Sequence, residues 1–261
     1  MRGDTQPRTG PDQTLLTDAL LDDFDPAALA EYRRVRNCLN PNAEELGYSD
    51  EDLLEALGAV RRAEGQPRPT LAGILLFGKT MALRRLLLMV KIDYIRVPGV
   101  EWIEDPHECF QSIEIRKPLL ALPLAEASII DELPKGFHLP AGELHSVQEP
   151  IVPRQVIPEA LANAVMHRSY TQHSPIQIIR YSNRIEIRNV GHSLKPVAHW
   201  ASPGSRLRNP TLAAVLHDLN LAEAKGTGIR RSIRRLAAGG WRLAAEAGLT
   251  LHEFYSSRES D

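Results

Sequence analysis

The segment IPEALANAVMHRSY, residues 157–170, constrains this chain more than any other. Glu159 and Asn163 stand four residues apart in a helix-forming run, so a helix places both side chains on one face. The apolar residues of the segment fall mostly on the other side, where they can pack against a sheet. A carboxylate can activate water, and a carboxamide oxygen can bind Mg²⁺. A solvated helix face explains the same spacing, so the residues after the segment decide between the two interpretations.

Two short strands are predicted directly after this helix, at residues 176–181 and 184–190. Only two residues separate them, which is the length of a tight hairpin loop. In the second strand Ile185 and Ile187 alternate with charged residues, so one face is buried and the other is wet. This strand ends at Asn189-Val190-Gly191, with a polar residue and a glycine.

A glycine-rich motif, KGTGIRR at residues 225–231, comes after a long linker. Gly226 and Gly228 flank Thr227, and a helix is predicted to begin near Ile229. The first N–H groups of a helix are free and lie at the positive end of its dipole, so such an entry can hold phosphate. A single G-T-G is a weak indication of a phosphate site. The order of elements is more specific: a helix, a hairpin, a strand end with Gly, a linker and then G-x-G.

This order resembles the GHKL superfamily of nucleotide-binding domains. It resembles more closely the C-terminal part of bacterial and archaeal proteins labelled RecG-like helicases or transcriptional regulators. The matching pieces are EALANAVMHRSY, IEIRNVG, SRLRNP and KGTGIRR, between residues 159 and 231, with a weaker match in TLAGILLFGK (70–79). The resembling proteins carry an N-terminal Schlafen AlbA-type module, which here is either lost or naturally absent.

The resemblance implies ATP and Mg²⁺ as ligands and a role in DNA-linked or transcriptional regulation. Glu159 becomes the candidate catalytic residue and Asn163 the candidate metal ligand. Segment 192–225 would form a mobile lid over the nucleotide. The residues expected to bind the nucleotide come from the helix, the strand end, the lid and the glycine motif: Asn163, His167, Asn189, Gly191, Ser205, Arg206, Arg208, Gly226, Thr227 and Gly228.

Three features depart from the resembling pattern. GHKL domains place Asp where this chain has Asn189, and an Asn carbonyl accepts from an adenine amino group more weakly than a carboxylate does. The helix ends in His-Arg-Ser-Tyr (167–170) in place of H-R-D-Y. Pro158 would kink a helix that begins at Pro153 but would suit the first turn of a shorter one. These departures weigh against hydrolysis more than against binding, so at most a weak ATPase is expected.

A second glycine motif, from Gly73 to Thr80, fits the G-x-x-x-x-G-K-S/T pattern of a phosphate-binding P-loop. Its four intervening residues, 74–77, are large and apolar, whereas a P-loop turns its backbone N–H groups toward an open crevice. The sequence QPRPT also stands where a strand is required. We therefore interpret the segment as core and expect no helicase motor.

Charge and composition limit the remaining function classes. A formal net charge of −2 and a pI of about 6.5 give no general attraction to nucleic acid or to anionic membranes. The two cysteines form no disulfide framework, and the nine histidines show no metal-ligand spacing. Without an apolar signal core or a long apolar run, we expect a cytoplasmic protein with no membrane partner.

We predict an α+β chain in which a GHKL-like (Bergerat) α/β sandwich follows a smaller α/β subdomain. The predicted parts are an N-terminal arm with a short helix (1–48), a mixed α/β subdomain (49–145) and a nucleotide-binding domain (146–261). Residues 1–14 are predicted to be disordered. Helices are predicted at 26–37, 49–63, 211–224 and over most of 107–133, strands at 86–98 and 249–257, and loops at 64–69 and 134–153.

Two other functions stay open. The chain can be a degenerate GHKL-fold interaction module that has lost its nucleotide. It can also bind DNA or RNA directly, through a basic helix or a missing N-terminal module, and it can form a homo-oligomer. The basic helix would carry Arg230, Arg231, Arg234 and Arg235, although a solvated face explains the same charges.

Overall fold

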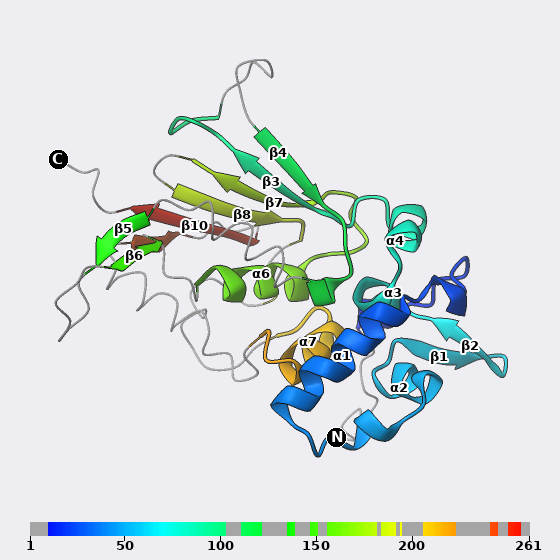
Figure 1. The fold of residues 1–261 in the computed structure, drawn as a ribbon. Coiled ribbons are helices and arrows are strands. Elements are labelled where there is room, and N and C mark those ends of the chain that lie inside the picture. The colour runs from blue at the N-terminus through cyan, green and yellow to red at the C-terminus, as the bar shows by residue number, and fades with distance from the viewer. Residues whose placement is uncertain are drawn as a thin grey trace, which may run out of the picture.

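The computed structural model describes residues 10–102, 111–121, 135–138, 147–150, 156–181, 184–191, 194, 206–222, 241–244 and 250–256. In these ranges the chain forms a six-stranded sheet, and α6 lies along one of its faces (Figure 1). Two separate hairpins, β1-β2 and β5-β6, lie outside this sheet. The α+β class is confirmed, and the GHKL-like sandwich stays a prediction.

The helices before the sheet are α1 (Pro26–Leu39), α2 (Asp50–Ala56), α3 (Leu71–Phe77) and α4 (Thr80–Leu86), with short 3₁₀ turns η1 (Pro11–Gln13), η2 (Leu21–Asp23) and η3 (Glu44–Gly47). Later come η4 (Leu119–Ala121), α6 (Val156–His167) and α7 (Pro210–Asp218). Side-chain caps explain three of the starts, because Asp25, Ser49 and Thr70 each accept a hydrogen bond from a backbone N–H of the first turn. The helix predicted at 26–37 is confirmed as α1.

The six strands lie in the order β4 (Gln111–Ile115), β3 (Ile92–Arg96), β7 (Ile176–Arg180), β8 (Arg184–Asn189), β10 (Thr250–Ser256) and β9 (Trp241–Ala244). Only the β3–β7 pair is parallel within this sheet. The predicted hairpin is confirmed as β7–β8, with Ile178 opposite Ile187. The strands predicted within 86–98 and 249–257 are confirmed as β3 and β10.

Two predictions upstream of the sheet were wrong. The helix predicted over 49–63 stops early because Gly58 has a φ of 66°, a left-handed conformation that closes a helix. The next residues form β1 (Val60–Ala63), which pairs with β2 (Gln66–Pro69). Most of the loop predicted at 64–69 is therefore strand. Glu64 and Gly65 make the turn, with φ values of 53° and 76°.

Two predictions in the middle of the chain were also wrong. β4 lies inside the stretch 107–133 that was predicted to be mostly helical, because pairing with β3 decides its conformation. The paired strands β5 (Lys135–His138) and β6 (Val147–Pro150) lie inside the loop predicted at 134–153. Residue 145 falls between these two strands, and the six-stranded sheet takes strands from both sides of it. The three predicted parts stay a prediction.

Residues 10–14 belong to the described part of the chain and are ordered there, against the expectation of disorder for this part of 1–14. Asp12 is fully buried, and its carboxylate accepts hydrogen bonds from the backbone N–H groups of Thr211 (2.8 Å) and Leu212 (3.0 Å). At the other end of α7, Arg36 donates to the carbonyl of Asp218. The early chain thus supplies an anion to the start of α7 and a cation to its end, which complements the helix dipole.

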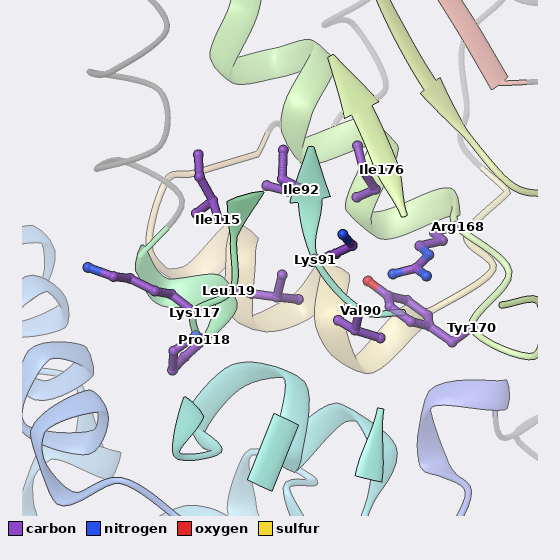
Figure 2. A pocket seen from close by; sticks show the side chains of 10 residues that line it. All are labelled: Val90, Lys91, Ile92, Ile115, Lys117, Pro118, Leu119, Arg168, Tyr170 and Ile176. Carbon is purple, nitrogen blue, oxygen red and sulfur yellow. The ribbon is translucent and has the colours of Figure 1, made fainter. Parts of the chain in front are cut away.

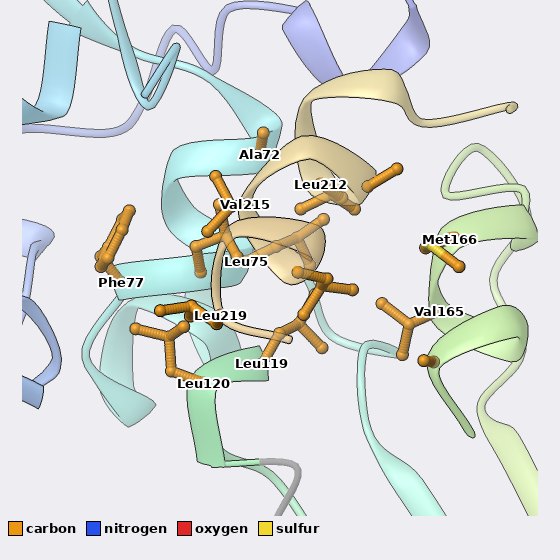
Figure 3. Close-up of a cluster of buried hydrophobic side chains, with 14 of the residues drawn as sticks. Ala72, Leu75, Phe77, Leu119, Leu120, Val165, Met166, Leu212, Val215 and Leu219 are labelled. Carbon is orange, nitrogen blue, oxygen red and sulfur yellow. The ribbon is translucent and has the colours of Figure 1, made fainter. Parts of the chain in front are cut away.

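One apolar core joins the early helices, α6, α7 and the inner face of the sheet. Figure 3 shows side chains that α3 (Leu75), α7 (Val215) and α6 (Val165) contribute to this core. Every residue of α3 is buried. A Cβ at Gly73 would stand 2.1 Å from the carbonyl oxygen of Ala59, so this glycine permits a close helix–backbone contact. These facts confirm the interpretation of the apolar residues 74–77 as core, while Lys79 and Thr80 are exposed.

No helix in the described ranges is both long enough and apolar enough to cross a membrane.

Candidate functional site

In the described part of the chain α6 runs from Val156 to His167, so Pro158 lies inside its first turn as described. Pro158 is the third residue of the helix, where a backbone N–H has no intrahelical partner in any case, so the proline costs no helical hydrogen bond. Glu159 follows in the first turn, where a negative charge suits the helix dipole. The predicted E-x-x-x-N pair therefore sits on an unbroken helix.

Glu159 and Asn163 lie together, as their spacing predicts. The side-chain nitrogen of Asn163 donates to Oε1 of Glu159 over 3.1 Å. Asn163 is 9% exposed, and Glu159 is half-buried. Because the amide nitrogen is engaged with the carboxylate, the amide oxygen is the atom of Asn163 suited to a metal ion. In the described part of the chain no group of three His, Cys, Asp or Glu residues is arranged to hold a metal.

Asn189 lies at the end of β8, on the sheet face that α6 covers. Its side-chain nitrogen donates to the carbonyl oxygen of Ala164 over 2.5 Å. This contact fixes the orientation of the amide, because the opposite orientation would set two oxygens against each other. The side chain is 2% exposed, and its Oδ1 has no hydrogen-bond partner among the described residues. A buried acceptor without a donor is costly and rare in folded proteins.

Gly191 joins the end of β8 to the end of α6. Its φ is 118°, and an added Cβ would come within 3.2 Å of the backbone nitrogen of Ser169. The same nitrogen donates to the carbonyl of Val190. Both the conformation and the close approach therefore require glycine. This contact brings His167, at the last position of α6, close to the strand end that carries Asn189.

His167 is uncharged at neutral pH. Burial, aided by the positive charge of Arg208, lowers its pKa to about 4. Nε of Arg208 donates to the backbone carbonyl of His167 over 3.0 Å. His167 can therefore contact a nucleotide as a neutral ring but not as a cation facing phosphate.

The remaining predicted residues divide into two groups. Arg206 is exposed just before the loop that closes on α6. Ser205, Gly226, Thr227 and Gly228 lie outside the described residues, as does the basic helix of Arg230, Arg231, Arg234 and Arg235. The structure thus places Glu159, Asn163, His167, Asn189, Gly191 and Arg208 around α6 and the end of β8, and their binding roles stay predictions.

Asn209 is a residue that sequence reasoning missed. It is fully buried, and its side-chain nitrogen donates to the carbonyls of Met166 (3.0 Å) and Arg168 (2.9 Å). With Arg208 it satisfies the carbonyls at the end of α6, which have no partners within the helix. The available signal was the sequence Asn-Pro before an apolar helical run, but it predicts only a helix start and not this distant contact.

Two family models match separate parts of the chain. The model described as "Putative ATP-dependent DNA helicase recG C-terminal" matches residues 173–256, which hold β7 to β10 with Asn189 and Gly191. A domain of unknown function, DUF8451, matches residues 1–93. The resemblance to the C-terminal part of RecG-like proteins is thereby confirmed for residues 173–256. The helix α6 precedes that match, and the link to Schlafen AlbA proteins stays a prediction.

Among solved structures, the chain is similar to the DIP2311 protein from Corynebacterium diphtheriae, with a TM-score of 0.68 and 23% sequence identity. The similarity covers 97% of this chain and 49% of that protein, so the chain spans about half the length of this relative. At this identity the likeness concerns the fold alone. No curated protein matches the chain.

Proposed function

We propose that the region around α6 and the end of β8 binds ATP or a related nucleotide with Mg²⁺. The observation that carries the proposal is the buried Oδ1 of Asn189, which has no donor among the described residues. The exocyclic amino group of an adenine is a donor of the required kind. Supplying it would remove a desolvation cost of about 1–3 kcal/mol.

The other residues of α6 fit the same ligand. Asn163 would hold the metal through its amide oxygen, and Glu159, hydrogen-bonded to it, would orient a water molecule. The match of residues 173–256 to a RecG-type C-terminal domain supports a nucleotide-linked function. Slow hydrolysis is the most that we propose, because Asn189 and Ser169 stand where the resembling proteins carry acids.

In this proposal the chain is a regulatory protein of the RecG-like, Schlafen AlbA-associated type, with DNA or RNA as its final target. The rival proposal is an interaction module that keeps the fold without the nucleotide. Thermal unfolding of the full chain with and without Mg-ATP separates the two. Ligand at 100 times its Kd stabilises a fold by about 2.7 kcal/mol, whereas an empty module shows no shift at millimolar Mg-ATP.

A further inference from the structure

A small cavity lies where β3 and β7 begin, next to the segment after α6. Its walls are aliphatic side chains of these strands and of the segment after β4, and its polar groups come from Lys91, Lys117, Arg168 and Tyr170 (Figure 2). The cavity has a volume of about 30 Å³. That is room for roughly two water molecules or one small anion.

Arg168 carries a buried positive charge into this cavity. Its side chain is 1% exposed, and one terminal nitrogen donates to the carbonyls of Met89 (3.0 Å) and Ser174 (2.6 Å). The guanidinium carbon lies 5.0 Å from the ring centroid of Tyr170. Nε has no hydrogen-bond partner within the described ranges, and no described carboxylate forms an ion pair with this guanidinium. Two carbonyls and one ring leave a full charge uncompensated, which is strongly unfavourable in an apolar setting.

The other cations of the cavity are placed differently. Lys91 is neutralised by Asp93 (3.0 Å) and Glu114 (2.8 Å). Glu114 is also bound by Arg116, so these two carboxylates are already matched by two cations. Lys117 is exposed, and Figure 2 shows its amine turned away from Arg168. Arg168 is therefore the buried cation of this cavity whose charge no described carboxylate neutralises.

We propose that this cavity binds a small inorganic anion, with the guanidinium of Arg168 as its principal donor. The apolar walls lower the local dielectric constant, which strengthens a contact between Arg168 and an anion. The volume suits a halide or a compact oxyanion, and water alone would satisfy Nε without neutralising the charge. This site involves neither Asn163 nor Asn189 and does not depend on nucleotide binding.

Thermal unfolding of the full chain tests the proposal at constant ionic strength. The titration begins in sodium gluconate, whose anion is too large for the cavity. Sodium chloride or sodium phosphate then replaces the gluconate salt stepwise. We expect the Tm of the wild-type protein to rise by several degrees and to level off as the small anion is added. Arg168→Met should lose this response, and Lys117→Met, which removes one positive charge from the same cavity, should keep it. The proposal is overturned if Tm rises without levelling off and by the same amount in wild-type protein, Arg168→Met and Lys117→Met.

Because Arg168→Met can fail to fold, a second measurement uses the wild-type protein. Crystals grown without phosphate or sulfate are soaked in sodium bromide, and the anomalous signal of bromine is mapped. We expect a bromide peak in the cavity within hydrogen-bond distance of the guanidinium of Arg168. A cavity that contains only water under these conditions contradicts the proposal.

Discussion

The side-chain nitrogen of Asn189 donates to the carbonyl oxygen of Ala164, and this single contact decides which atom of the amide is left for a ligand.

Asn189→Leu removes the acceptor and should lower Mg-ATP affinity at least about tenfold. Asn189→Asp keeps an acceptor but sets a carboxylate against the carbonyl of Ala164. It should retain nucleotide binding while lowering the free energy of unfolding by roughly 1–3 kcal/mol at neutral pH. Calorimetric titration and urea unfolding measure the two effects. Equal nucleotide affinity in wild-type protein and Asn189→Leu would remove the basis of the proposed site.

Asn163 and Glu159 are expected to act on different steps. Asn163→Ala should weaken Mg-ATP about tenfold or more and leave metal-free ATP almost unchanged, because only the metal contact is lost. Glu159→Gln should abolish any phosphate release while sparing binding. Titration with Mg²⁺ and with EDTA separates the metal-bound from the metal-free affinity. Equal losses of both in Asn163→Ala would refute the metal assignment.

The two glycine motifs are expected to respond in opposite ways. Gly228→Ala should cost nucleotide affinity with a modest loss of stability, since a Cβ there would obstruct an anion at a helix start. Lys79→Ala should leave affinity unchanged, because the Lys79 amine already donates to the carbonyl of Asp22. Gly73→Ala should unfold the core by its clash with Ala59. Loss of binding in Lys79→Ala but not in Gly228→Ala would reverse the assignment.

The buried His167 makes stability depend on pH in a defined direction. Its pKa in the folded chain is about 4, below the usual value of 6.5. The unfolded chain therefore takes up this proton first as pH falls, so the stabilisation is full above pH 6.5 and is lost on acidification toward pH 4. The shift corresponds to roughly 3 kcal/mol. Urea unfolding between pH 7 and 4 should show a steeper loss in wild-type protein than in His167→Gln. Parallel pH profiles would contradict the prediction.

Asp12 is expected to stabilise α7 through its two backbone contacts. Asp12→Ala leaves the backbone N–H groups of Thr211 and Leu212 without their acceptor and should lower the free energy of unfolding by about 1–2 kcal/mol. Asp12→Asn keeps an acceptor and removes a buried charge, so it should cost less. Burial raises the pKa of Asp12, so its pH-dependent contribution is greatest in acid and is lost as pH rises through the folded pKa. Identical stabilities of the Ala and Asn variants would argue against capping.

Local patterns predicted the parts of the site that depend on neighbouring residues. The i, i+4 spacing placed Glu159 beside Asn163, and the two-residue gap predicted the β7–β8 hairpin. The prediction of a long helix missed β4, although Ile113 and Ile115 alternate with polar residues as in a strand, and pairing with β3 decides the conformation. The β5–β6 hairpin was missed because its prolines and glycines favoured a loop.

Contacts between distant residues could not be predicted from spacing. The orientation of the Asn189 amide depends on a backbone carbonyl of α6, and a backbone group leaves no signal in the sequence. Arg208 and Asn209 lie about 40 residues after the end of α6 in the sequence, so they contact it only when the chain between them has folded. The loop that carries Arg208 and Asn209 was predicted to act as a lid and to bind phosphate, because no neighbouring residue indicated that it would cap the end of α6.

The capping of α7 by the early chain also sets the order in which the protein can be completed. Asp12 and Thr211 are 199 residues apart, and Arg36 and Asp218 are 182 apart. During synthesis on the ribosome, the Asp12 carboxylate has no partner until α7 emerges, and the core against α3 stays open as well. Closure of such long loops is slow and comes late. The nascent chain must therefore wait, with its apolar helices uncovered, until α7 (Pro210–Asp218) has been made, and this interval is when it most needs chaperones.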